Sequence, residues 1–210
     1  MICAKEEAGT LHRGLREVYI DRTTSSYIDG KEGKLYYRGY NIDDLATNCS
    51  FEEIIYLVMM GDLPTESELT NFTTELRSNM TIPDQIVDVI RATKEAHPMD
   101  VLRTAVSALA AFDDEVDDNS PEATLRKGTR LTAQAPTIVT AHARIRDGKD
   151  PVQPDPNLGL AANFLYMITG EKPDKEMERV FDVCLILHAD HTFNASTFAA
   201  REVASTRAHM

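Results

Sequence analysis

The chain has 210 residues, of which 42% are hydrophobic and 27% charged, with 10 glycines and 9 prolines. These values are typical of a globular protein and exclude the collagen-like, low-complexity and disordered classes. Asp and Glu outnumber Lys and Arg by 34 to 22, giving a net charge of −12 that disfavours nucleic acid and anionic membrane surfaces as partners.

Neither a membrane span nor an export signal is expected from the sequence. The longest apolar runs, such as Ala105 to Phe112, are far shorter than the ~20 residues that cross a bilayer. The N-terminus carries acidic residues where a secretory signal would be basic. Cys3, Cys49 and Cys184 lie far apart and form no Cys-x-x-Cys pair. We therefore expect reduced thiols and a cytoplasmic location.

The N-terminal part of the chain contains the predicted β-structure. β-forming residues flank the segment Asp29 to Gly33, whose two glycines permit the positive φ of a tight turn. The sequence therefore predicts a hairpin over residues 24–40. It follows an N-terminal segment, residues 1–23, and precedes a helical part, residues 41–210.

Most of the expected helices have recognisable start signals. Ser50 and Thr65 are each followed three residues later by glutamate, which forms a capping box for the backbone N–H groups of the first turn. Pro83, Pro121 and Pro173 fit first helical positions, where a missing N–H is tolerated. The predicted helices are 51–60, 65 to about 80, one starting at 83, 99–112, 122 to about 147, 157–168, 174–188 and one starting at 195.

Particular features are expected in the later helices. The 99–112 segment is apolar over most of its circumference, which predicts burial in a core or an oligomer interface. Pro136 predicts a kink or a break one turn before it. Helices 157–168 and 174–188 should pack as an antiparallel pair. The last helix reaches Met210 without a stop signal, so we expect a downstream half to be missing.

The densest polar cluster runs from His188 to Ser196. Asn194 is placed to cap the following helix, and Asp190 to fix a neighbouring imidazole tautomer. His188 alone, on an apolar stripe, is most simply a core residue. His191 is the stronger candidate, because two imidazoles, a carboxylate and a carboxamide exceed what packing requires. A metal site is the alternative, but no second cluster completes a ligand shell.

The other histidines and the common nucleotide-binding and hydrolase motifs give no further candidate site. His97 is interpreted as a residue of the turn before a helix, and His142 as facing solvent on a helical wheel. His12 and His209 lie near the termini, where disorder is the default. No glycine-rich phosphate loop and no Gly-x-Ser-x-Gly elbow occurs in the sequence.

The segment Leu187 to Thr206 closely resembles the citrate synthase family in its bacterial and archaeal form. Segments 26–40, 50–65 and His97 to Met99 stand in the family's order and spacing, so the resemblance covers nearly all of residues 14–207. It implies an all-α, multi-helical large domain with a small N-terminal hairpin, truncated before the small domain. It also implies an acyltransferase of the tricarboxylic acid cycle that condenses acetyl-CoA with oxaloacetate to citrate and CoA.

The resemblance also assigns roles to residues of the polar cluster. The histidine that matches His191 binds oxaloacetate, and Asn194 and Ser196 support that site from close by. His188 and Asp190 resemble further supporting residues. The family needs no metal and no cofactor besides acetyl-CoA as substrate. A homodimer is implied, through helices near 99–112 and 121–147.

Several family residues are not found in this sequence. The enol-stabilising histidine of a Gly-Pro-Leu-His-Gly stretch, the aspartate base and the carboxylate-binding arginines belong beyond Met210. Thr192 replaces a glutamate common in relatives, and Arg201 is the cation nearest to the cluster. Because a thioester methyl loses its proton only to a base working with an enol stabiliser, we expect no catalytic residue here and no activity of this chain alone. Two alternatives stay open: a 2-methylcitrate synthase that uses propionyl-CoA, and a non-catalytic helical dimerisation module.

Overall fold

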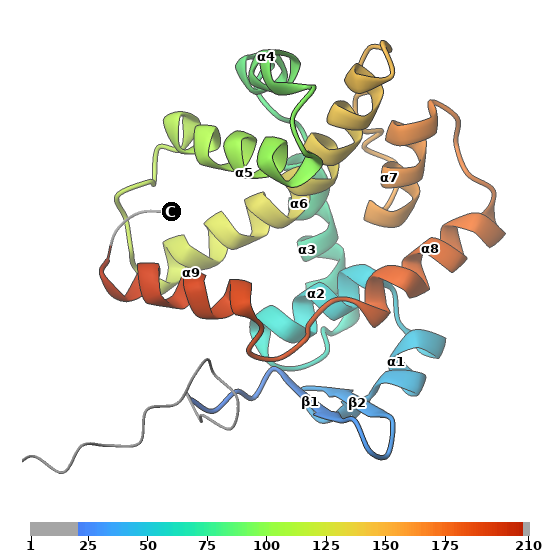
Figure 1. Ribbon diagram of the computed structural model, residues 1–210. Coiled ribbons are helices and arrows are strands. Elements are labelled where there is room, and N and C mark those ends of the chain that lie inside the picture. The colour runs from blue at the N-terminus through green and yellow to red at the C-terminus, as the bar shows by residue number, and fades with distance from the viewer. Residues whose placement is uncertain (1–20, 208–210) are drawn as a thin grey trace, which may run out of the picture.

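The computed structural model describes residues 21–207 (Figure 1). Its elements are β1 (Ser26–Asp29), β2 (Lys34–Tyr37), β3 (Tyr40–Asn41), α1 (Ile42–Asn48), α2 (Phe51–Met60), α3 (Glu66–Ser78), α4 (Asp84–Thr93), α5 (Pro98–Leu109), a 3-10 turn (Ala110–Phe112), α6 (Pro121–Arg146), α7 (Leu160–Thr169), α8 (Lys175–Leu187) and α9 (Ala195–Ser205). The mainly helical fold with a small N-terminal sheet is as predicted. Cys3, His12 and His209 lie outside the described residues.

The sheet contains the predicted hairpin and one further strand. β1 and β2 pair antiparallel with Ser26 opposite Tyr37, and β3, which was not predicted, pairs with β2. Of the two turn glycines only Gly33 has a positive φ, +65°. At the other end of the turn, Oδ1 of Asp29 accepts the backbone N–H groups of Lys31 and Glu32 at 2.9 and 3.0 Å. An aspartate side chain therefore makes the bend for which the sequence suggested a second glycine.

The helix boundaries confirm both capping boxes and correct the proline positions. Ser50 and Thr65 each accept the N3 backbone N–H, and Gly61 ends α2 in the left-handed region at φ +105°. Pro121 is the first residue of α6, whereas Pro83 is the N-cap of α4. Pro173 precedes the N-cap of α8, which is Asp174. Asp174 takes the N-cap position because its side chain accepts a first-turn N–H, whereas the side chain of proline has no acceptor group.

The two helices singled out by sequence differ from expectation. α5 buries only the stripe of Val101, Ala105 and Leu109, whereas Met99 and Phe112 are 62% and 46% exposed. The prediction that most of this circumference is buried within the chain's own core is therefore wrong, and burial in an oligomer interface stays a prediction. α6 continues through Pro136 to Arg146, so the predicted alternative of a break is also wrong.

The helices pack around three apolar clusters, and α6 runs through the middle of the molecule (Figure 1). One cluster joins α4, α5 and α6, and a second joins α2, α3, α6 and α7. The third joins the sheet to α1, α2 and α8 through Tyr37, Leu45 and Ile186. α7 and α8 pack as predicted, with the rings of Phe164 and Phe181 stacked at 4.8 Å between centroids.

α8 presents a different face to the core than its sequence suggests. Asp182 and Ile186 are its buried residues. In the apolar stripe of Met177, Val180, Phe181, Cys184 and Leu187, only Phe181 is half-buried, against Phe164, whereas Met177 and Val180 are each 54% exposed. Oδ1 of Asp182 accepts the backbone N–H of Phe51 at 2.9 Å, so the inward carboxylate caps the start of α2. A hydrogen-bonding requirement thus turns most of the apolar stripe outward in this chain.

A second buried carboxylate continues this arrangement. Oε1 of Glu52 on α2 accepts the backbone N–H of Leu160, the first residue of α7, at 2.8 Å. Burial raises the pKa of Glu52. A Cβ on Gly159 would lie 2.8 Å from the same oxygen, which explains the glycine at this N-cap. The starts of α2 and α7 are therefore each fixed by an acid from another helix.

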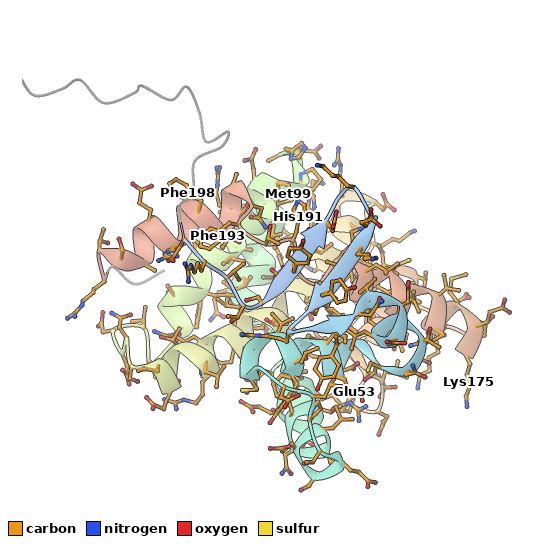
Figure 2. All side chains as sticks on the ribbon, turned by 90° about the horizontal axis from the view of Figure 1, so that it is seen from below. Glu53, Met99, Lys175, His191, Phe193 and Phe198 are labelled. Carbon is orange, nitrogen blue, oxygen red and sulfur yellow. The ribbon has the colours of Figure 1, made fainter. Side chains whose placement is uncertain are left out.

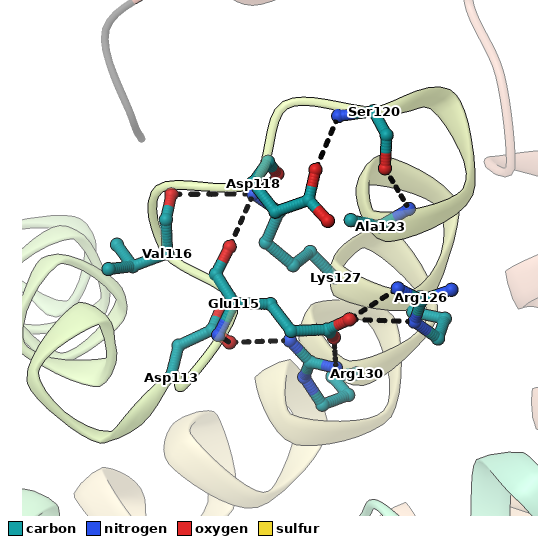
Figure 3. A network of polar contacts seen from close by, with 9 residues as sticks. All are labelled: Asp113, Glu115, Val116, Asp118, Ser120, Ala123, Arg126, Lys127 and Arg130. Atoms are coloured by element: carbon teal, nitrogen blue, oxygen red, sulfur yellow. Dashed lines mark hydrogen bonds and ion pairs between the residues drawn. The ribbon is translucent and has the colours of Figure 1, made fainter.

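The loop between α5 and α6 is held by ion pairs (Figure 3). The Glu115 carboxylate accepts from Arg126 Nε at 2.9 Å and from Arg130 Nη1 at 2.8 Å. Arg130 also pairs with Asp113 at 2.7 Å, and Lys127 Nζ donates to loop carbonyl oxygens. The two arginines lower the pKa of Glu115 to about 2.

Gly159→Ala should lower the free energy of unfolding by about 1–3 kcal/mol, because the new methyl displaces Glu52 and leaves the buried Leu160 N–H unpaired. In a Glu52→Ala background the same substitution should cost much less. Urea unfolding followed by circular dichroism measures both costs. Gly128→Ala is the matched control, since its Cβ would meet Met59 Cε at an ordinary 3.5 Å. Equal costs of Gly159→Ala in the two backgrounds would contradict this account.

Glu115→Gln should lower the melting temperature at pH 7 and flatten its decline in acid. The folded-state pKa of Glu115 is about 2, below the ordinary 4.5, so its stabilisation is present above pH 4.5 and lost as the pH falls toward 2. Thermal unfolding between pH 7 and pH 2 measures this. Glu171→Gln, at an exposed acid outside the network, is the control. A wild-type and a Glu115→Gln curve that run parallel throughout would disprove the assignment.

Candidate functional site

The predicted polar cluster forms the connection between α8 and α9 (Figure 2). α8 ends at Leu187 with His188 as its C-cap. Asn194 is the N-cap of α9, and its Oδ1 accepts the backbone N–H of Thr197 at 2.8 Å, as predicted. The intervening residues, 189–193, form an irregular segment that leads from one helix to the next.

Side chains from the sheet hold this segment. The hydroxyl of the buried Tyr37 donates to the carbonyl oxygen of Ile186 at 3.0 Å and accepts from the backbone N–H of Asp190 at 3.5 Å. Ser26, opposite Tyr37 on the neighbouring strand, accepts the backbone N–H of Thr192 at 3.1 Å. Burial raises the pKa of Tyr37, which keeps its proton available for donation.

The backbone of the connection is strained at one residue. Thr192 has φ +58°, in the left-handed region where a β-branched residue is rare. Its N–H is held by Ser26, and its carbonyl oxygen accepts the N–H of Asn194 at 3.0 Å. The two peptide units that flank Thr192 are therefore each held by a hydrogen bond, and together these maintain the unfavourable φ.

The histidines of the cluster lie at the surface. His188 is exposed, so its interpretation as a core residue is wrong. Its Nδ1 lies 2.7 Å from the carbonyl oxygen of Cys184, which only accepts, so Nδ1 carries the proton; no hydrogen bond of Nε2 is found in the described part of the chain. His191 is also exposed, and no hydrogen bond of its ring is found within residues 21–207. His191 lies beside the strands in Figure 2.

The remaining predicted residues serve different purposes. Asp190 was expected to fix an imidazole tautomer, but the carbonyl of Cys184 does this for His188. Oδ2 of Asp190 is buried and has no hydrogen-bond partner in the described part of the chain. Asn194 is used as a helix cap, and Ser196 is exposed on the first turn of α9.

Arg201, the nearby cation, is already engaged. Its guanidinium lies 5.4 Å from the ring centroid of Phe193, in a cation–π arrangement, and it pairs with Asp21. The arginine therefore ties α9 to the start of the described chain. Figure 2 places Phe193 and Phe198 toward α9, away from the strands.

Cavities in the described part of the chain lie elsewhere. One, of about 840 Å³, is lined by apolar residues of α5 and the 3-10 turn and by mainly polar residues of α6, including Lys127 and Arg130, with Ala204 and Arg207 also in its lining. Another, of about 420 Å³, lies between α5, α6 and the end of α7. Residues 188–196 line neither of them. His191 is thus an open surface position in this chain.

The two other described histidines have structural roles. His97 is the N-cap of α5, and its Nδ1 accepts the N–H of Met99 at 3.2 Å, as its position predicted. His142 is only 5% exposed, and its Nε2 contacts the carbonyl oxygen of Lys94 at 3.1 Å. The helical wheel was wrong there, because the end of α4 covers a face that the wheel of α6 assigns to solvent.

The described residues form neither a metal site nor a membrane span. Within residues 21–207, no group of three His, Cys, Asp or Glu side chains is arranged to hold a metal ion. In the same range no helix combines the length and apolar character needed to cross a bilayer.

The contacts of Ser26 and Tyr37 with the junction were not predicted from the sequence. The signal for these residues in the sequence was their place in a predicted hairpin.

Comparisons with known proteins agree with the fold. Residues 14–210 match the family model described as "Citrate synthase, C-terminal domain". The citrate synthase of Haloferax volcanii is 45% identical over 204 residues, covering 95% of this chain and 54% of the relative. A 2-methylcitrate synthase of Mycobacterium tuberculosis is 40% identical over 203 residues, covering 96% of this chain and 51% of the relative.

Solved structures give the same result. The crystal structure of citrate synthase from Pyrobaculum aerophilum superposes with a TM-score of 0.89 and 38% identity, covering 100% of this chain and 56% of that one. The chain spans about half the length of the curated relatives it matches. Taken with the helical architecture and the α8–α9 junction, these matches show that the chain belongs to the citrate synthase family.

Proposed function

We propose that this chain supplies the oxaloacetate-binding part of a citrate synthase-type enzyme, which condenses acetyl-CoA with oxaloacetate to citrate and CoA in the tricarboxylic acid cycle. The observation that carries the proposal is the α8–α9 junction, where exposed His191 lies between residues anchored to the sheet. An imidazole N–H donates readily to a keto or carboxylate oxygen. Nε2 of His188 and the cap Asn194 are proposed to support the site from the same segment.

Binding of the keto acid and its condensation with the thioester have different chemical requirements. Removing a proton from a thioester methyl requires a base together with a donor that stabilises the enol oxygen. Oxaloacetate also carries two carboxylates, whereas Arg201 is already paired with Asp21. We therefore propose that this chain binds the keto acid and that condensation requires the further groups of the complete enzyme.

Assembly as a homodimer is proposed for the faces of α5 and α6. Met99, Phe112 and Val139 are large apolar side chains that stay exposed there. Exposed apolar groups of this kind favour a protein interface. A dimer that binds no keto acid would instead support the non-catalytic helical module. The cytoplasmic location stays a prediction from the sequence.

A second candidate reaction uses propionyl-CoA in place of acetyl-CoA. It is favoured by the relatives named 2-methylcitrate synthase, which are 40% identical to this chain. Both reactions condense a thioester with the same keto acid, so the role proposed for His191 is common to the two.

His191→Ala should weaken the binding of oxaloacetate at least about tenfold, because one charge-assisted hydrogen bond contributes ~1.5–3 kcal/mol. Isothermal titration calorimetry on the 210-residue chain measures the dissociation constant. The unfolding midpoint should not change, since the ring is exposed. His97→Asn, which removes an imidazole but keeps an N-cap, is the control. Binding by His191→Ala that equals the wild type would refute the proposed site.

The purified chain should release no CoA from acetyl-CoA or propionyl-CoA in the presence of oxaloacetate. The physical reason is that a single imidazole does not act as both base and enol stabiliser. Chromatographic detection of CoA is preferable to a thiol dye, because Cys49 and Cys184 are free. Measurable release would contradict the proposed inactivity, and the faster thioester would then identify the acyl substrate.

A further inference from the structure

We propose that Ser26 and Tyr37, paired across the hairpin, are positioning residues that orient His191. This proposal deepens, and rests on, the proposed role of His191 in keto-acid binding. The two residues belong to the sheet, far from His191 in sequence, and reach the junction only through the fold. Neither is proposed to touch the substrate.

The hydrogen bonds fall on the two immediate neighbours of His191. Tyr37 Oη lies 3.5 Å from the backbone nitrogen of Asp190, and Ser26 Oγ lies 3.1 Å from that of Thr192. Tyr37 also donates to the carbonyl oxygen of Ile186 at 3.0 Å, which secures the last turn of α8 before the junction. The hairpin therefore holds the chain before and after the histidine.

These contacts restrict the backbone around the histidine. A side chain leaves the backbone along the Cα–Cβ bond, and the adjoining peptide planes set the direction of that bond. Ser26 holds the peptide between His191 and Thr192, which adjoins the histidine, and Tyr37 holds the peptide one residue further back, between Ala189 and Asp190. The backbone torsions left free between these two held peptides are few. Preorganisation of this kind lowers the entropic cost of binding a small ligand.

The two hydroxyl groups are themselves held in place. Tyr37 is fully buried and Ser26 is 7% exposed, so water does not readily replace their partners. A buried hydroxyl or N–H that loses its partner destabilises the fold, which keeps the contacts formed. The left-handed φ of Thr192, +58°, is the sign that these contacts override local preference.

Nuclear magnetic resonance of the histidine rings tests the positioning directly. Tyr37→Phe and Ser26→Ala each remove one hydroxyl from this contact and retain most of the packing. The His191 ring signals, assigned by their loss in His191→Ala, should shift and broaden in both variants. The signals of His97 and His142 should stay in place, because their partners lie on other elements.

Two matched controls remove a hydroxyl from residues next to the positioning residues, for which no side-chain hydrogen bond to the junction is found within residues 21–207. They are Tyr36→Phe and Ser25→Ala, whose neighbours in sequence are the positioning residues. Unmoved His191 signals in both Tyr37→Phe and Ser26→Ala would overturn the proposal. Equal movement of all histidine signals would also overturn it, because that result describes general loosening of the fold.

Calorimetry with oxaloacetate separates this inference from the proposed function. We expect each variant to bind about fivefold more weakly than wild type, and the double variant about tenfold or more. Wild-type affinity in the double variant would overturn the positioning role. If the wild-type chain itself binds no oxaloacetate, the proposed function fails, and the ring signals alone decide whether the hairpin orients His191.

Discussion

The hydroxyl of Tyr37 is the interaction on which the arrangement of this chain's junction depends. Its ring fills the cluster shared by the sheet, α1, α2 and α8, and its oxygen satisfies the last turn of α8 at Ile186. Burial of apolar surface would by itself attach the hairpin to the helices, but the hydrophobic effect does not favour one orientation of the hairpin over another. The hydrogen bond from Tyr37 to Ile186 sets this orientation, so that α8 ends at one fixed place against the sheet.

The need for a hydrogen-bond partner also governs other helix ends. Helices leave unpaired N–H groups at their starts, and buried starts must find acceptors. Asp182 supplies one to α2 and Glu52 supplies one to α7, so three helices are joined by two carboxylates. Because Asp182 points inward, the apolar stripe of α8 points outward except at Phe181, with Met177 and Val180 exposed. Polar satisfaction therefore determined the orientation of α8, against the simplest expectation from its hydrophobic pattern.

Side-chain capping signals in the sequence were reliable, whereas the exact positions of prolines and contacts between distant segments were not predictable. The capping boxes at Ser50 and Thr65 and the cap at Asn194 depend on residues three positions apart, and all were found. His142 was misplaced because its cover comes from α4, and Tyr37 was overlooked because its partners lie about 150 residues away. The cluster of His188 to Ser196 was visible as composition, but its anchoring to Ser26 was not.

Charge limits what the junction achieves by itself. The proposed ligand, a dianionic keto acid, would approach a chain of net charge −12, and Arg201 is already shared with Asp21 and the ring of Phe193. Hydrogen bonds from an exposed imidazole would orient such a ligand but offset little of this repulsion. The affinity expected of this chain alone is therefore weak, and further cations of the complete enzyme would strengthen it. The junction would therefore contribute mainly by orienting the ligand, and the hairpin holds the backbone of the junction in place for this.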